Sequence, residues 1–301
     1  MTLRRIRAFI QMTRPLFIGG GLILYLFGAA LAVTQGAAIN WLRLVLGQLL
    51  VTSIQLTTHC ANEYYDYEVD RLIGERRTPF SGGSGVLVNG QLDRRVALHA
   101  LRACLVIAVI TLIISGLIVP ALWLIGLIAL CGGYFYSAPP LTLESSGFGE
   151  LDTVFLTAVL VPLTGYTMQT GQVDASVLRF ALPLLLIDLA MILTFEFADY
   201  PADKEIGKKN ITVRIGLKRA AWLHQALLIG GAVLLFALTP VPPLLAWIVV
   251  ALVVWQIAGV AWRSRSGWQQ FAMLSGGAVL LSGIIPAIWL LDLLLKLIGI
   301  Y

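Results

Sequence analysis

Long apolar segments recur along almost the whole chain, separated by short stretches that contain charges, proline or glycine. A helix needs about 20 apolar residues to cross a bilayer, and the segment 244–262 is apolar throughout except for Gln256. A transmembrane β-barrel would instead show alternating segments of about ten residues. The pattern therefore predicts an all-α polytopic membrane protein with nine transmembrane helices, near residues 16–34, 42–61, 97–117, 119–138, 151–171, 178–199, 220–239, 242–262 and 272–297.

The composition agrees with this pattern. Of the 301 residues, 58% are hydrophobic and only 12% are charged, about half the charged share of an average soluble domain. This composition excludes a soluble globular protein. No long hydrophilic run remains for a separate soluble domain, so we expect residues 1–301 to form a single integral membrane domain.

Basic residues are unevenly shared between the two sides of the predicted bundle. If the N-terminus lies in the cytoplasm, 18 of the 21 Lys and Arg residues fall on the cytoplasmic side, and only Arg43, Arg179 and Lys296 fall outside. Cytoplasmic loops of membrane proteins carry an excess of Lys and Arg. This bias predicts a cytoplasmic N-terminus and an external C-terminus. The two long charged connections, 62–96 and 199–219, then face the cytoplasm, and we expect the functional site on that side.

Two acidic motifs follow the second and the sixth predicted spans. The first contains Asn62, Asp66 and Asp70, and the second contains Asp199 and Asp203. Residues four positions apart share one face of a helix, so each pair of aspartates can direct its oxygens toward one point. The glutamates beside these motifs are interpreted as surface charges: Glu63, Glu68, Glu75 and Glu205.

The sequence after the first motif is repeated after the second. Residues 70–76 and residues 203–209 both read acid, base, any residue, Ile, Gly, any residue, base. Corresponding segments of duplicated halves usually surround one central site. We therefore expect an internal duplication, with halves of about 1–140 and 141–301, and a central cavity between the halves.

Polar residues inside two spans point to the same cavity. One stripe along the second span consists of Gln48, Thr52, Gln55, Asn62, Asp66 and Asp70. On the sixth span, Asp188 precedes Asp199 by eleven residues, about three turns, and so shares its face about 16 Å deeper. Polar side chains facing lipid would be costly, so both stripes should line an interior cavity. Asp188 is accordingly predicted to contribute to substrate binding.

Carboxylates and basic residues in this arrangement fit a diphosphate site. Mg²⁺ typically binds one or two carboxylates and completes its shell with water and substrate phosphates. The predicted metal ligands are the four aspartates of the two motifs: Asp66, Asp70, Asp199 and Asp203. The predicted charge-assisted contacts to a diphosphate come from Arg71, Arg77, Lys204 and Lys208. Tyr65, between Tyr64 and Tyr67, offers an electron-rich ring to a developing cation.

Two other interpretations stay open on the residues alone. Charges that follow a transmembrane span are most often solvated loop charges. A cation or proton transporter would also use intramembrane carboxylates. It would need them near the middle of the bilayer, where Asp188 alone is predicted to lie.

The spacings Asn62-x-x-x-Asp66-x-x-x-Asp70 and Asp199-x-x-x-Asp203 resemble the two signatures of the UbiA superfamily of intramembrane aromatic prenyltransferases. The resemblance covers the whole chain, because that family has nine helices with its motifs after the second and the sixth. It implies an enzyme that uses Mg²⁺ to ionise a polyprenyl diphosphate and joins the prenyl group to an aromatic ring.

The resemblance also implies roles for individual residues. The four aspartates would bind Mg²⁺ and diphosphate, and Asn62 would lie at the reacting end of the substrate. Arg77 resembles the family's basic residue in the loop after the first motif. Tyr136 and Ser137 resemble the segment that leaves the family's fourth helix.

Within the superfamily, four segments are similar to the branch that prenylates 1,4-dihydroxy-2-naphthoate in menaquinone synthesis: residues 62–67, 147–150, 169–171 and 207–216. That branch usually has Asn and Arg just ahead of its second motif, where this chain has Phe195, Glu196 and Ala198. Other acceptors stay open, namely 4-hydroxybenzoate, homogentisate or a tetrapyrrole. The resemblance implies small-molecule substrates and membrane lipid as partners, no nucleic acid, and a bacterial plasma membrane as the location.

Overall fold

The computed structural model describes residues 3–74, 77–80, 82–266 and 272–299, and every regular element in these ranges is a helix. Within these described ranges, eight helical segments are long and apolar enough to cross a membrane, and they lie at eight of the nine predicted positions. These segments are α2 (Pro15–Thr34), α3 (Trp41–Tyr65), α5 (Arg94–Ile118), the run Gly149–Thr170, the run Ala175–Glu205, α12 (Leu217–Leu238), α13 (Pro243–Ser266) and α14 (Ala272–Leu297). The all-α membrane class is therefore confirmed.

The remaining predicted span, 119–138, which is the fourth along the chain, is shorter than expected. It corresponds to α6 (Ala121–Phe135), whose 15 residues extend over about 22 Å, less than the roughly 30 Å of a bilayer core. Pro120 precedes its first residue, and the chain turns after Phe135 ahead of Pro139 and Pro140. The sequence stays apolar beyond Phe135, so hydropathy predicted a longer span. The prolines that follow prevent the helix from continuing.

Two of the membrane-spanning runs are composite. The run Gly149–Thr170 consists of α8 (Gly149–Val154), the π-helical turn η2 (Phe155–Leu160) and α9 (Val161–Thr170). The run Ala175–Glu205 consists of the short η3 (Ala175–Val177) and the long α10 (Leu178–Glu205). Four short helices complete the described chain: α1 (Leu3–Met12), α4 (Tyr67–Ile73), α7 (Leu143–Ser146) and α11 (Ile211–Ile215).

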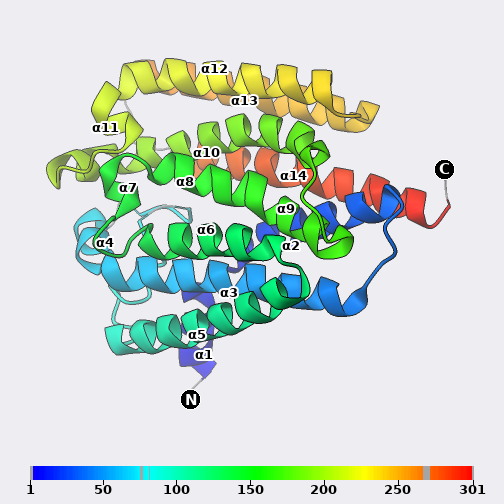
Figure 1. Ribbon diagram of the computed structural model, residues 1–301. Coiled ribbons are helices and arrows are strands. Elements are labelled where there is room, and N and C mark those ends of the chain that lie inside the picture. The colour runs from blue at the N-terminus through cyan, green and yellow to red at the C-terminus, as the bar shows by residue number, and fades with distance from the viewer. Residues whose placement is uncertain (1–2, 75–76, 81, 267–271, 300–301) are drawn as a thin grey trace.

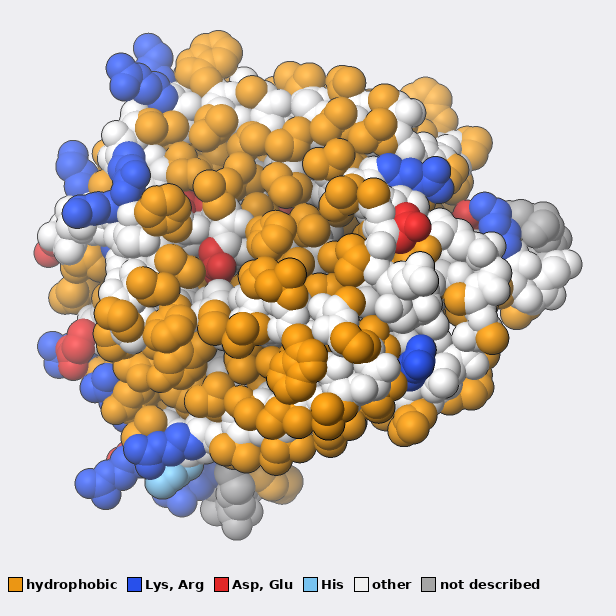
Figure 2. All heavy atoms as spheres, in the orientation of Figure 1, with side chains coloured by type: hydrophobic (Ala, Val, Ile, Leu, Met, Phe, Trp, Pro, Cys, Tyr) orange, Lys and Arg blue, Asp and Glu red, His pale blue; other side chains and the backbone are white. Residues whose placement is uncertain are grey.

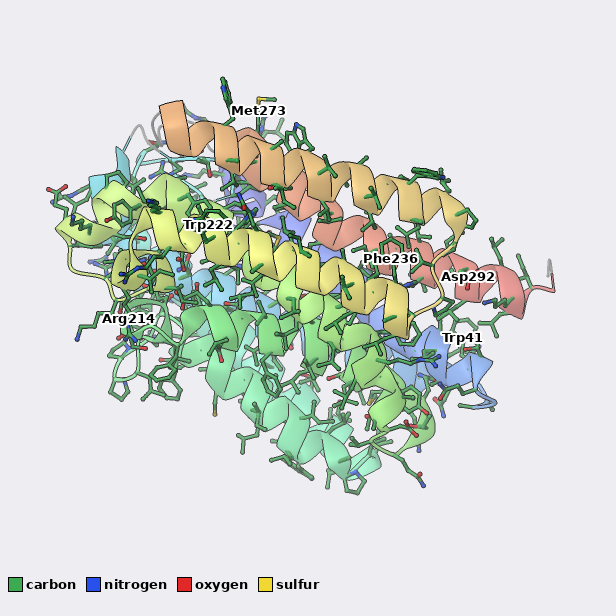
Figure 3. The ribbon with its side chains drawn as sticks, turned by 90° about the horizontal axis from the view of Figure 1, so that it is seen from above. Trp41, Arg214, Trp222, Phe236, Met273 and Asp292 are labelled. Atoms are coloured by element: carbon green, nitrogen blue, oxygen red, sulfur yellow. The ribbon has the colours of Figure 1, made fainter. Side chains whose placement is uncertain are left out.

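The bundle has two different ends. Helices α4, α7 and α11 lie at one end, and the C-terminus lies at the other (Figure 1). Figure 2 shows hydrophobic side chains over the middle of the visible face and most Lys and Arg side chains at the end with α4, α7 and α11. Figure 3 places Arg214 near this end and Trp41 and Asp292 near the opposite one.

Large apolar side chains cover the outside of the bundle. Trp222, Trp247 and Met273 are 68%, 75% and 71% exposed. An apolar surface this extensive is rare on a soluble monomer and suits contact with lipid chains. The protein is an integral membrane protein.

The interior is tightly packed where α2, α10 and α14 meet. Phe27, Phe180 and Trp289, one from each helix, form a cluster with ring centroids 5.0 to 5.4 Å apart. Helix α2 also approaches α9 closely, because a Cβ at Gly28 would lie 1.9 Å from the Pro162 carbonyl oxygen. These contacts fix the helices around the cavity described next.

Candidate active site

The first acidic motif lies where α3 ends and α4 begins, with Asp66 between the two helices. Asn62 Nδ2 donates hydrogen bonds to Asp66 Oδ2 and, at 3.0 Å, to Ser137 Oγ. Ser137 Oγ donates in turn to Asp66 Oδ2 at 3.1 Å. The segment after α6 therefore holds an aspartate of the motif in place.

The second acidic motif lies on the last turns of α10, which continues to Glu205 although Pro201 lies inside it. Asp203 is buried and accepts a hydrogen bond of 2.7 Å from Asn210 Nδ2. Lys208 Nζ lies 3.8 Å from Asp203 Oδ1 and 3.7 Å from Glu144 Oε2. Lys208 thereby connects the second motif to α7.

Both motifs line one cavity of about 960 Å³. The polar lining includes Asn62, Asp66, Asp70, Asp199, Asp203 and Lys208, together with Arg14, Glu144, Glu150, Glu196 and Asn210. Apolar side chains from α2, α3, η2, α10 and α14 line the rest, among them Leu24, Leu50, Leu160, Met191 and Leu280. A cavity with one charged part and one apolar part suits a molecule with an anionic head and a hydrocarbon tail.

Tyr136 and Asp188 line the same cavity. Asp188 is 4% exposed, is hydrogen-bonded to Ser282 of α14, and has one oxygen, Oδ1, that accepts no hydrogen bond. Ser137 lies just behind the cavity wall and reaches it through Asp66. The structure thus brings together most of the residues that the sequence singled out.

Besides Ser137, four of the predicted substrate contacts lie outside the cavity lining. Arg71 is 63% exposed and pairs with Glu68 at 3.3 Å, and Lys204 is exposed with its Nζ 5.8 Å from the centre of the Tyr200 ring. The Tyr65 hydroxyl lies 3.3 Å from that of Tyr134. Arg77 Nη2 donates to the backbone oxygen of Asp70 at 3.2 Å and so supports the first motif from behind.

Glu63 is buried, and the prediction of a surface charge was wrong. Its side chain is 2% exposed, and its Oε1 lies 3.1 Å from Arg14 Nη2. The backbone N–H and the hydroxyl of Ser84 both donate to its carboxylate at 2.7 Å. The loop after α4 folds back onto α3, and Arg14 supplies the opposite charge, which the sequence could not reveal. Glu75 lies outside the described residues.

Several cavity residues were missed as site residues by the motif analysis. Arg14 was counted only as a topology signal, and Glu144, Glu150 and Asn210 lie in loops or at the start of helices. Glu150 ends the segment Gly147-Phe148-Gly149-Glu150, and the repeated Gly of that segment was the only feature of the sequence that could have drawn attention to Glu150. Glu196 was noted only as a difference from one branch of the family, and it lies three residues before Asp199 on the same helix.

Burial governs the electrostatics of the first motif. Burial, and next the neighbouring Glu144, raise the pKa of Asp66 well above its usual value. Burial raises the pKa of Asp70 to about 6. Burial by itself would lower the pKa of Lys208, but Glu144 and Asp203 together raise it. A cation bound in this cavity would therefore stabilise the ionised form of these carboxylates.

The donor set fits Mg²⁺ bound together with a phosphate. Among the described residues, no three His, Cys, Asp or Glu side chains gather closely enough to form a complete metal site. Mg²⁺ does not require such a cage, because it usually takes one or two carboxylates and fills its shell with water and substrate oxygens. The aspartates offer only oxygen ligands, and Asp203 Oδ1 accepts no hydrogen bond.

A helical membrane bundle around a large amphipathic cavity is the architecture of an intramembrane enzyme that acts on lipid-like substrates. Residues 22–293 match the model of the UbiA prenyltransferase family. The chain therefore belongs to this family and is a prenyltransferase.

Curated relatives agree with this assignment, and a solved structure shares the fold. The chain is 26% identical over 221 residues to 1,4-dihydroxy-2-naphthoate octaprenyltransferase of Bacillus subtilis, covering 72% of this chain and 68% of the relative. It is 28% identical over 253 residues to the enzyme of the same name from Mycobacterium tuberculosis, covering 83% and 82%. The fold is similar to a UbiA homologue from Archaeoglobus fulgidus bound to GPP and Mg²⁺, with a TM-score of 0.61, 19% identity, and coverage of 93% and 99%.

Proposed function

We propose that the protein transfers a polyprenyl group from its diphosphate to an aromatic acceptor in a Mg²⁺-dependent reaction, with 1,4-dihydroxy-2-naphthoate as the acceptor. The observation that carries this proposal is the arrangement of two aspartate motifs and Lys208 around the charged part of a cavity whose remainder is apolar. A diphosphate suits the charged part, and an isoprenoid chain suits the apolar part.

The residues of the cavity have distinct tasks in this reaction. The aspartates of the two motifs would hold Mg²⁺, which would supply positive charge to stabilise the departing diphosphate. Lys208 contributes a further positive charge, and Glu144 and Asp203 keep its ammonium group in place. Asn62 orients Asp66. The apolar walls exclude water, which would otherwise capture the allylic cation.

The acceptor is the finer part of the proposal. Its support is the function named for the Bacillus and Mycobacterium relatives, at 26% and 28% identity. The alternatives are 4-hydroxybenzoate, homogentisate and a tetrapyrrole. An ion transporter is the alternative of another class, and it is disfavoured because the motif acids cluster at one end of the bundle, near α4 and α11.

We further propose that the site opens toward the cytoplasm of a bacterial plasma membrane. The bias of 18 basic residues against three supports this orientation. Lys209 is exposed at the motif end, and Gln172 is exposed between α9 and η3. After Lys209→Cys and Gln172→Cys substitutions in a background without native cysteines, an impermeant thiol reagent added outside intact cells should label only position 172. Labelling of position 209 alone would reverse the orientation.

The decisive experiment offers the purified protein labelled geranylgeranyl diphosphate, Mg²⁺ and each candidate acceptor in turn. We expect release of diphosphate and a prenylated product, with the highest kcat/KM for 1,4-dihydroxy-2-naphthoate. A higher value for another acceptor would change the acceptor but keep the reaction. Neither product nor diphosphate with any acceptor would refute the proposed function.

A further inference from the structure

Two buried glutamates lie against each other in the wall of the cavity. Glu150 comes from the first turn of α8 and Glu196 from α10, and they are only 3% and 8% exposed. The two side chains lie close enough for their carboxyl groups to interact directly. Both residues belong to the cavity lining that also contains Asp199 and Asp203.

Each carboxyl group is fixed by one backbone N–H. Ile211 N donates to Glu150 Oε1, and Thr212 N donates to Glu196 Oε2 at 3.0 Å. The other oxygen of Glu150, Oε2, is buried and accepts no hydrogen bond from a protein donor. Among the described residues, no Lys, Arg or His nitrogen lies within 4.0 Å of either carboxyl group.

Two buried carboxylates in contact, with no cation beside them, repel each other, and this repulsion favours the uptake of a proton. Each carboxylate can accept further hydrogen bonds besides the one from the backbone N–H. A hydroxyl group is complementary to such an acceptor, because it can donate a hydrogen bond and then give up its proton.

A purely structural role would not require two acids. Glutamine side chains could accept the same hydrogen bonds from Ile211 and Thr212 without the cost of burying ionisable groups. The pair also lies near the reacting end of the cavity, because Glu196 is one helical turn before Asp199. The acidity of the pair is therefore expected to serve the chemistry.

We propose that the Glu150–Glu196 pair binds a hydroxyl group of the aromatic acceptor and that Glu196 takes up the hydroxyl proton as the ring attacks the prenyl group. This inference rests on the proposed function. It adds a catalytic residue and requires an acceptor whose hydroxyl is conjugated with the attacked carbon.

Transfer of the prenyl group is coupled to transfer of the hydroxyl proton. The bond between the prenyl carbon and the diphosphate oxygen breaks, and its electron pair leaves with the diphosphate. A π pair of the ring forms the new carbon–carbon bond, the O–H pair becomes part of a carbonyl, and the proton moves to Glu196. The attacked carbon then loses a proton to the released diphosphate, or loses CO₂ from its carboxylate, and the electron pair left behind restores the aromatic ring while the oxygen regains a proton from Glu196. The pair ends in its starting state.

The test separates acceptor chemistry from diphosphate chemistry. The full-length protein, with Mg²⁺ and geranylgeranyl diphosphate, is assayed for slow release of diphosphate without acceptor and for prenylated product with 1,4-dihydroxy-2-naphthoate, or with the hydroxylated acceptor that proves best. Variants are Glu196→Gln and Glu150→Gln, with Glu205→Gln as the control because Glu205 is exposed on the same helix. The same assays use the O-methyl ethers of the acceptor.

We expect Glu196→Gln to lower the kcat for prenylation by about 10² to 10⁴, the usual contribution of general acid–base catalysis, while diphosphate release changes less than about threefold. With the methyl ether of the bound hydroxyl, the wild type should fall to the level of the variant. Glu205→Gln should match the wild type in both assays.

Equal losses of prenylation and diphosphate release in Glu196→Gln would overturn the inference, because the pair would then only support the second motif. Unchanged prenylation would overturn it as well. If Glu196→Gln does not fold, Glu150→Gln must show the same selective loss, since it removes the neighbouring negative charge that makes Glu196 a better proton acceptor. A wild type that neither releases diphosphate nor prenylates any acceptor would refute the proposed function itself.

Discussion

Arg14 Nη2 donates a hydrogen bond of 2.6 Å to Asn62 Oδ1, across 48 positions of sequence. A guanidinium group can only donate, so this contact fixes the Asn62 carboxamide with Oδ1 toward Arg14 and Nδ2 toward Asp66. Arg14 also pairs with the buried Glu63. The residue that precedes the first membrane-spanning helix thereby orients the first acidic motif.

We predict that Arg14→Met lowers kcat/KM for the prenyl diphosphate by about tenfold to a hundredfold. Loss of a hydrogen bond to a charged group costs about 1.5–3 kcal/mol, and Glu63 would lose its opposite charge. Arg7→Met is the matched control, because Arg7 is exposed on α1. Steady-state kinetics of diphosphate release measure both variants. Equal activity of the two would show that Asn62 keeps its orientation without Arg14.

Asp66→Asn and Asp199→Asn should each abolish diphosphate release while the protein keeps its fold. Each substitution removes a negative charge from the proposed metal site with little change in volume, so the loss falls on chemistry and not on packing. Size-exclusion chromatography in detergent and circular dichroism check the fold. Addition of EDTA to the wild type should have the same effect on activity. Full activity in EDTA would eliminate the Mg²⁺ mechanism.

Stabilisation by Mg²⁺ should increase with pH. Burial raises the pKa of Asp70 to about 6 and that of Asp66 as well, so the folded state holds these protons more tightly than the unfolded chain does. Without metal, the stability that this protonation provides is present below about pH 4 and is lost as the pH rises through about 6. Mg²⁺ binds the ionised form, so its effect on the Tm should be larger at pH 8 than at pH 5. Thermal melts with and without Mg²⁺ measure this difference, and a larger effect at pH 5 would contradict the assignment of the ligands.

Lys208 and Lys204 should respond differently to the same substitution. Lys208 lines the cavity between Glu144 and Asp203, whereas Lys204 is exposed. We expect Lys208→Gln to raise the KM for the prenyl diphosphate about tenfold or more, because it removes a buried positive charge from an anion site. Lys204→Gln should change KM less than about twofold. A larger effect at Lys204 would indicate that Lys204 contacts the diphosphate, as its position in the sequence suggested.

The sequence predicted the helices and the two motifs because both depend on local patterns. Apolar runs locate membrane spans, and acids at positions i and i+4 locate one face of a helix, as at Asp199 and Asp203. The length of α6 was overestimated because hydropathy does not register the turn after Phe135. The internal duplication stays a prediction.

The parts of the site that were not predicted depend on contacts between distant segments. Arg14 meets Asn62, and Glu150 meets Glu196, only after the bundle has assembled. Arg71 and Lys204 have equivalent places after the two motifs, yet both are exposed and neither lines the cavity. Sequence spacing predicts which residues share one face of a helix, but not whether that face contacts the cavity or solvent. Charged residues near a motif therefore could not be assigned to the cavity or to the surface.

Asp188→Asn should alter the preference for acceptor or prenyl chain length and leave the Mg²⁺ affinity unchanged. Asp188 lines the cavity, is hydrogen-bonded to Ser282, and lies eleven residues before Asp199, about 16 Å deeper along α10. A carboxyl group at this depth is costly in a membrane protein, which favours a functional role over a packing role. The amide keeps the shape of the side chain, so competition assays with prenyl diphosphates of several lengths and with several acceptors isolate the effect of its charge. An unchanged preference in a protein with a lower Tm would mean that Asp188 only joins α10 to α14. A change in Mg²⁺ affinity alone would place Asp188 with the metal ligands instead.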